Sequence, residues 1–269
     1  MSELSDARHL LFDLSPFGKA EYADGLSQPE SAEELGGVTI SEMKDFFKAK
    51  ELENCDSYLP ERLFVALGES LELHHGTQEE RKAFGPPNGA ALHENAHVHV
   101  YRMIKSGRLM EKYPEDAKTV LQHGLDVQEV VSCIGHGSWE EEELSLLYRA
   151  CEIYQRANDL QAGTSIMVLF NWAVALTDIG RIVKKRNGGE AAEYLGAASL
   201  KYAALIGLEP GHAQALNNWG LVIRDLSDLL PLSIAEGLLE SSLALFRKAI
   251  RSELSDLILL ARCSYNLGE

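Results

Sequence analysis

The stretch LFNWAVALTDI at residues 169–179 returns 47 residues later as LNNWGLVIRDL at residues 216–226. A weaker third copy, Asn266-Leu267-Gly268, follows Asn218 after 48 residues. Self-similarity at a fixed spacing of this size predicts stacked units of secondary structure. Stacked helical units usually form a surface that holds other proteins, so the repeat indicates a kind of function without naming the partner.

A second repeated pattern lies between the copies of the first. It consists of a small residue, an aromatic residue four positions later, and a further apolar residue after three more positions, which all share one face of a helix. The copies are Ala150/Tyr154/Ala157, Ala198/Tyr202/Leu205 and Ser242/Phe246/Ala249. A small residue lets two helices approach closely, and the aromatic ring fills the space beside it. From about residue 140 the sequence therefore predicts alternating helices that pack in pairs.

This alternation resembles the tetratricopeptide repeat (TPR), in which a first helix with a large and a small residue pairs with a second helix carrying small, aromatic and small residues. The stretch LEPGHAQA at residues 208–215 is similar to the proline that ends such a repeat and the start of the next first helix. The resemblance covers about residues 140–269 and departs from the family in length, because the usual unit has about 34 residues. Long units with Asn-Asn-Trp-Gly are similar to those of TPR proteins from plants and algae. The resemblance implies a short helical superhelix.

The remainder of the chain carries weaker patterns. Residues 1–38 hold apolar spots without a sustained period and are expected to form an extended arm, followed by a helical region at 39–136 and the TPR-like units at 137–269. In the middle region we expect helices at about 90–104 and from Pro114 to Gly124, and a short one that Asp126 caps and that ends near Gly135. Strand signals are almost absent. The predicted fold class is all-α: an irregular helical N-terminal half followed by a TPR-like superhelix, with a continuation past Glu269 left open.

The composition limits which classes of partner and which cellular compartments fit this chain. A formal charge of -16, from 41 acidic and 25 basic residues, argues against nucleic acid, because binding to phosphate backbones needs clustered cations. The four cysteines form no C-x-x-C pair, which favours a reducing compartment, either the cytoplasm or a plastid stroma after removal of a presequence. The longest apolar stretch, at about residues 165–176, falls short of a membrane span.

The TPR resemblance also implies which residues bind a partner. Trp172 and Trp219 are expected in the core, and the opposite face of each first helix is expected to line a groove. The predicted partner-binding residues are Met167, Phe170, Val174, Gln214, Asn217, Asn218, Leu221 and Arg262. This composition suits an amphipathic helix or an apolar extended peptide. The alternative is that the N-terminal half of the chain itself covers Phe170 and Val174.

A chaperone or targeting adaptor is a second possible function. TPR proteins that hold the acidic C-terminus of a chaperone use a Lys and an Asn in one first helix, an Asn in the next and basic residues in the third. Phe170 and Val174 stand at the first two places, whereas Asn218 and Arg262 retain the others. Half of this carboxylate clamp is missing, so we expect no binding to such C-termini.

A zinc-dependent hydrolase is the alternative from a different class. His93-Glu94-Asn95-Ala96-His97 matches H-E-x-x-H, in which two His on one helical face bind zinc and the Glu activates water. The chain has nine His, so a chance match is not rare, and no second metallopeptidase feature follows. Stoichiometric zinc that is lost on changing His93 and His97 would favour this function.

The leading prediction is a non-enzymatic scaffold or accessory subunit of a larger assembly. It binds protein partners, has no catalytic residue, and uses no metal or cofactor. No phosphate-binding Gly loop, nucleophile elbow or pair of catalytic carboxylates is present in the sequence.

Overall fold

The computed structural model describes residues 59–60, 62–63, 66, 96–134, 139–252 and 257–267. These residues form α-helices and no strand, which confirms the all-α prediction for this part of the chain. The helices are α5 (Ala96–Lys112), α6 (Ala117–Cys133), α7 (Glu140–Leu160), α8 (Ile166–Val183), α9 (Gly188–Leu208), α10 (Ala213–Ser227), α11 (Leu232–Ser252) and α12 (Leu257–Leu267). The predicted arm at 1–38 lies outside the described residues.

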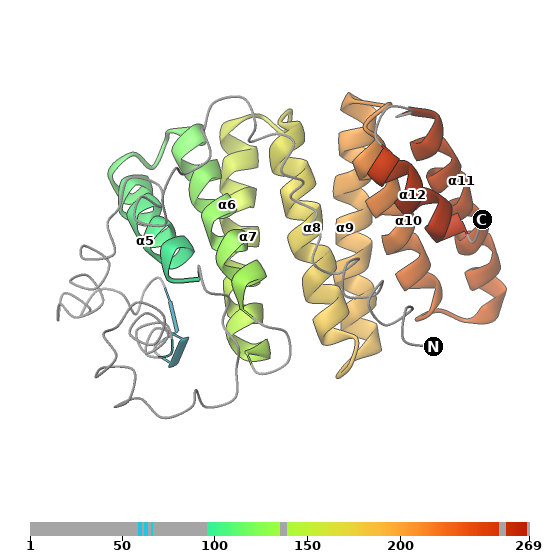
Figure 1. Ribbon diagram of the computed structural model, residues 1–269, viewed down its shortest axis with the longest axis horizontal. Helices are drawn as coiled ribbons and strands as arrows, with labels where there is room; N and C mark the ends of the chain where they lie inside the picture. The colour runs from blue at the N-terminus through green and yellow to red at the C-terminus, as the bar shows by residue number, and fades with distance from the viewer. Residues whose placement is uncertain are drawn as a thin grey trace.

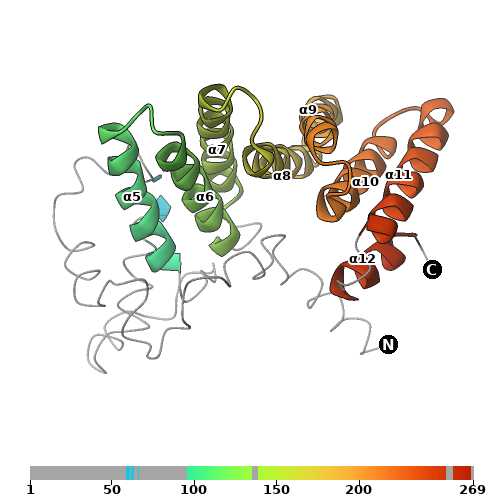
Figure 2. The ribbon, with the colours of Figure 1, turned by 90° about the horizontal axis from the view of Figure 1, so that it is seen from above.

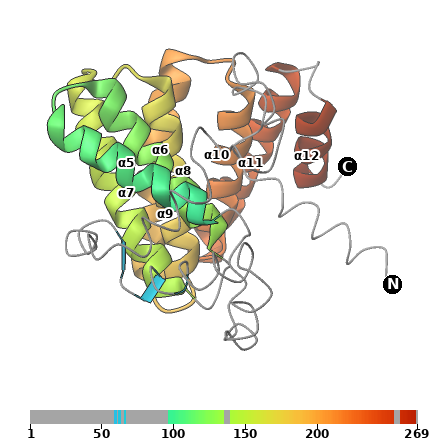
Figure 3. The ribbon, with the colours of Figure 1, turned by 60° about the vertical axis from the view of Figure 1, so that its left-hand side comes forward.

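The helices stand side by side in the order of the chain (Figure 1), and each packs mainly against the helix before it and the helix after it. Seen from above they form an arc, with α6, α8, α10 and α12 on its inner side and α7, α9 and α11 on its outer side (Figure 2). A view turned toward the α5 end shows α12 at the far end of the row (Figure 3). Because contacts are between neighbours, the arc is held together pair by pair.

Each outer helix inserts one ring into its inner partner, as the small-aromatic pattern predicted. Tyr154, Tyr202 and Phe246 are at most 1% exposed, and the small residues beside them in the pattern are also buried. A Cβ placed on Gly220 would lie 2.5 Å from Cε1 of Phe246, and one on Gly124 would lie 2.7 Å from Cε1 of Tyr154. Only glycine admits so close a ring at these two positions. The same pairing of a small residue with a ring therefore exists between α6 and α7. Gly124 stands 49 residues before Ala173, which is the small residue after the first repeated tryptophan.

The prediction of two helices around Gly124 was wrong. Residues 117–133 form the single helix α6, whose N-cap is Asp116 with a hydrogen bond from the Thr119 amide at 3.0 Å. Gly124 does not end the helix because Tyr154 packs against it, which compensates for the low helix propensity of glycine. Asp126 accepts a hydrogen bond from Gln122 one turn earlier, at 2.9 Å, and caps nothing.

Helix α8 is the centre of the arc and is apolar on nearly every side. Val168, Ala175 and Ile179 belong to the core shared with α5, α6 and α7, whereas Leu169 and Ala173 belong to the core shared with α9 and α10. Of the described helices α8 alone is long and apolar enough to cross a membrane, and 67% of it is buried inside the protein. Contact with two cores accounts for this composition, because a helix buried all round is apolar all round.

The turn between α7 and α8 contains a strained alanine. Ala162 has φ of 52°, and the turn is closed by hydrogen bonds from the Gly163 amide to the Asn158 carbonyl at 2.9 Å and from the Ala162 amide to the Asp159 carbonyl at 3.3 Å. This is a Schellman motif, whose left-handed position favours glycine.

Replacing Ala162 with glycine is expected to raise the free energy of unfolding by up to about 1 kcal/mol, because glycine adopts this φ without a steric cost. Urea denaturation followed by circular dichroism measures the change. Gly163→Ala is the matched control: its φ is 74°, so the substitution is expected to destabilise the protein. An Ala162→Gly variant that is less stable than the parent would contradict the assignment.

Candidate functional site

The predicted groove residues lie on the inner helices α8, α10 and α12, and they fall into exposed and buried sets. Met167, Gln214 and Arg262 occupy equivalent positions, 47 and 48 residues apart, on the three inner helices. Met167 is 48% exposed, whereas Gln214 and Arg262 are half-buried. Tyr265, one turn beyond Arg262 on α12, is 67% exposed. We call three residues of the predicted site and the neighbouring exposed tyrosine the inner row: Met167, Gln214, Arg262 and Tyr265.

The expectation that Phe170 and Val174 line an open groove was wrong. Phe170 is 9% exposed and Val174 is 5% exposed. The Phe170 ring stacks on His212, with centroids 5.5 Å apart, and meets the edge of Tyr202 at 6.2 Å. Helix α9 and the start of α10 therefore contact Phe170, and both residues belong to the core between α8, α9 and α10.

Asn217 is buried as well, at 4% exposed, and it joins α10 to α12. Its Oδ1 accepts hydrogen bonds from Nδ2 of Asn266 at 3.0 Å and from the Cys263 thiol at 3.4 Å. Its Nδ2 donates to Oδ1 of the half-buried Asn218 at 3.4 Å. Asn218 and Asn266 are thus both engaged with Asn217, which limits what Asn218 can offer to a ligand.

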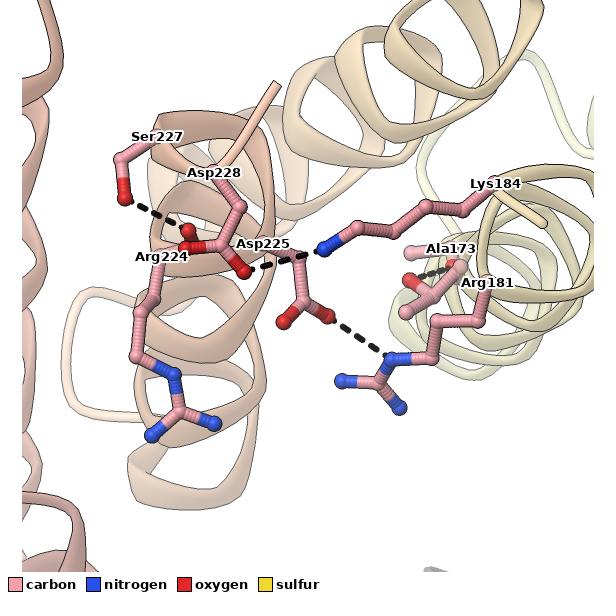
Figure 4. A network of polar contacts seen from close by, with 8 residues as sticks. Ala173, Arg181, Lys184, Arg224, Asp225, Ser227 and Asp228 are labelled. Atoms are coloured by element: carbon pink, nitrogen blue, oxygen red, sulfur yellow. Dashed lines mark hydrogen bonds and ion pairs between the residues drawn. The ribbon is translucent and has the colours of Figure 1, made fainter. Parts of the chain in front are cut away.

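Leu221 is half-buried, one turn farther along α10. A set of ion pairs joins the C-terminal ends of α8 and α10 (Figure 4). Arg181 Nε donates to Asp225 at 2.8 Å, and Lys184 Nζ donates to Asp228 at 3.0 Å. Desolvation by burial opposes the charge of Arg181, but the nearby Asp225 carboxylate prevails, so that its pKa is raised. These pairs fix the spacing of two inner helices.

Four cations lie close together at the C-terminal end of α8, and each has an acidic partner: Arg181, Lys184, Lys185 and Arg186. Besides the two pairs with α10, Lys185 and Arg186 both contact Glu140 at the start of α7, at 3.1 and 2.7 Å. Hydrogen bonding to Lys185 is the main cause of a lowered pKa at Glu140. Because each cation is paired with a neighbouring helix, this cluster ties α7, α8 and α10 together and leaves little charge for an external anion.

The prediction that both repeated tryptophans lie in the core was wrong. Trp172 and Trp219 are half-buried, while the small residues after them, Ala173 and Gly220, are buried. Lys201 on α9 lies 3.4 Å from the centroid of the Trp172 ring, and Trp219 Nε1 donates to Ser199 on α9 at 2.7 Å. The indoles cover the sides of α9, and the ring that fills each core comes from the outer helix.

The structure also contains a buried polar cluster that the sequence did not reveal. His123 on α6 is 0% exposed; its Nδ1 lies 3.1 Å from Ser106 Oγ on α5 and its Nε2 lies 3.4 Å from Arg149 on α7. A guanidinium only donates, so Nε2 accepts and the proton is on Nδ1. The Ser106 hydroxyl donates to the Met103 carbonyl at 3.0 Å. His123 therefore cannot take the proton of Ser106, and the pair is not a nucleophile with its base.

Catalytic groups of other kinds are also poorly placed in the described part of the chain. Burial raises the pKa of Cys133 to about 11 and that of Cys151 to about 12, so both thiols stay protonated at neutral pH and are weak nucleophiles. The described residues contain no group of three or more His, Cys, Asp or Glu that could hold a metal ion. His93, Glu94 and the His97 side chain lie outside them, so the zinc motif stays a prediction.

Comparison with known proteins adds no relative. No family model, no curated protein and no solved structure matches this chain.

Proposed function

We propose that this protein is a non-enzymatic interaction scaffold, or an accessory subunit of an assembly, that holds a segment of a partner protein against the inner side of its arc. The observation that carries the proposal is the inner row. Equivalent positions of the inner helices α8, α10 and α12 carry Met167, Gln214 and Arg262, and the exposed Tyr265 follows Arg262 on α12. A repeated row along stacked helices suits an extended or helical segment that touches several units at once.

The chemistry of the inner row indicates what kind of segment fits. It combines a long apolar side chain, an amide, a guanidinium and an exposed phenol, which are side chains that recur at the centres of protein interfaces. The burial of Phe170 and Val174 leaves Asn218 and Arg262 without the rest of a carboxylate clamp. We therefore propose that TPR-like units bind the partner segment through apolar contacts along its length and not through a terminal carboxylate.

A paired set of variants tests the proposal. Met167→Glu with Tyr265→Glu places two charges on exposed positions of the inner row, and Leu200→Glu, on the outer helix α9 and 72% exposed in the parent, is the control. Proteins that copurify from the cell extract are identified, and direct binding of the purified partner is then measured by calorimetry. We expect the inner variant to weaken binding at least tenfold and the outer variant to leave it unchanged.

Stability is measured on each variant, since the substituted positions are exposed and the fold should persist. Equal binding by the inner variant and the parent would overturn the assignment of the inner row. Equal loss in both variants would show that the contact is elsewhere or depends on net charge.

A further inference from the structure

We propose that His123, Ser106 and Arg149 form a proton-sensitive latch that holds α5, α6 and α7 together at neutral pH and opens under acid. The inference is independent of the partner-binding proposal. It concerns three helices at one end of the arc, whereas the inner row lies on α8, α10 and α12. The latch would let the cell compartment, or a passage into an acidic one, control whether the faces between these helices are exposed.

The geometry explains why the imidazole acts on three helices at once. His123 has no exposed surface, and its two nitrogens face side chains of the two flanking helices: Ser106 on α5 at 3.1 Å and Arg149 on α7 at 3.4 Å. Protonation of Nε2 would point a new N–H at a guanidinium that itself only donates. The accepting contact would become a repulsion between two cations at a buried position, and separating the helices relieves it.

Other charges near the latch come from α5 and α6. Asp126 and Glu129 lie on α6; the Asp126 carboxylate interacts with the Ser106 side chain of the latch, and both carboxylates interact with Arg102 on α5. Burial raises the pKa of both carboxyl groups, so as the pH falls they take up protons more readily in the closed state than in the open one. This effect opposes opening as the pH falls. The latch is examined between pH 7 and pH 5, a range in which His123 in an open state takes up its proton, and the variants below separate His123 from the two carboxyl groups.

The direction and size of the pH effect on opening follow from the pKa of His123 in the closed and in the open state. Burial, helped by the nearby Arg149, lowers its pKa from 6.5 to about 4 in the folded protein. As the pH falls below 6.5, His123 binds a proton in an open state but stays neutral in the closed state until about pH 4. The closed state is therefore favoured most above pH 6.5 and loses stability toward pH 4. For these values, any opening that exposes His123 becomes about 20-fold more populated between pH 7 and pH 5.

Two buried thiols allow opening to be measured in the intact chain. Cys133 is in α6, in the core shared with α5 and α7, and Cys263 is in α12 at the other end of the arc. Both are labelled with a dipyridyl disulfide, which reacts at acidic pH, and peptide mapping assigns each rate. Rates are divided by that of a small thiol at the same pH. We expect the corrected Cys133 rate to rise about 20-fold from pH 7 to pH 5 and the Cys263 rate to change much less.

Variants decide whether His123 is responsible. In His123→Gln the side-chain Oε1 can still accept from Arg149 but does not titrate, so the pH dependence at Cys133 should fall below threefold. His99→Gln, on α5 and 3.8 Å from Glu129, is the matched control and should retain it. An unchanged rise in His123→Gln, or an equal rise at Cys263, would overturn the latch. If His123→Gln does not fold, Arg149→Met in its place should weaken the pH dependence, and a full dependence there would contradict the proposal.

Discussion

Replacing Phe246 with alanine is expected to lower the free energy of unfolding by about 3–5 kcal/mol, which is the usual cost of removing a fully buried aromatic side chain. Phe246 is 1% exposed, and its ring lies against the backbone of Gly220 in α10. No neighbour can fill the space without moving one of the two helices. Chemical denaturation at constant pH gives the change.

The control for this prediction is on the same helix. Leu239 in α11 is 43% exposed, so Leu239→Ala should cost less than about 1 kcal/mol. Because contacts in the arc are between neighbours, the loss at Phe246 should also reduce the protection of α11 and α12 amides from hydrogen exchange more than that of α6 amides. Similar costs for the two variants would contradict the role of the ring.

Replacing Gly220 with alanine is expected to destabilise the protein by about 1–3 kcal/mol, although alanine is the better helix former. The added methyl group would meet Cε1, Cδ1 and Cζ of Phe246 at 2.5, 2.8 and 3.0 Å. A phenyl ring cannot bend away from such contacts, so the helices must shift apart. Thermal and urea denaturation measure the effect.

A glycine without neighbours provides the matched control. Gly196 in α9 has nothing within 4 Å of an added Cβ, so Gly196→Ala should stabilise the protein by about 0.5–1 kcal/mol. Combining Gly220→Ala with Phe246→Leu should cost less than the sum of the single changes, because the smaller side chain makes room for the methyl group. Strict additivity would show that Gly220 and Phe246 do not compete for this space.

The sequence predicted the pairing of helices because the relevant signals are local. Small and aromatic residues at spacings of four and three share one helical face whatever lies opposite, and the structure buries all three copies. Gly124 escaped the prediction, since a glycine inside a polar stretch is typical of a helix end. Its place in the helix depends on Tyr154, which is 30 residues away in the chain.

The candidate site was predicted less well, because exposure is a property of neighbours. Met167 and Phe170 lie less than one turn apart on α8, yet one is 48% exposed and the other 9%. The difference comes from two rings that contact Phe170: Tyr202 on α9 and His212 directly before α10. The same holds for the indoles of Trp172 and Trp219, whose exposure is set by the sides of α9.

The sequence by itself determined that the described chain is helical, that two patterns recur along it, and which small and aromatic residues share one buried helical face. These properties follow from the spacing of residues along one helix, and this spacing can be read directly from the sequence. The tertiary structure alone decided which faces remain open and how the polar groups pair. His123 lies between Ser106 and Arg149, and Arg181 meets Asp225, because packing brings together residues 17 to 44 positions apart that share no local pattern.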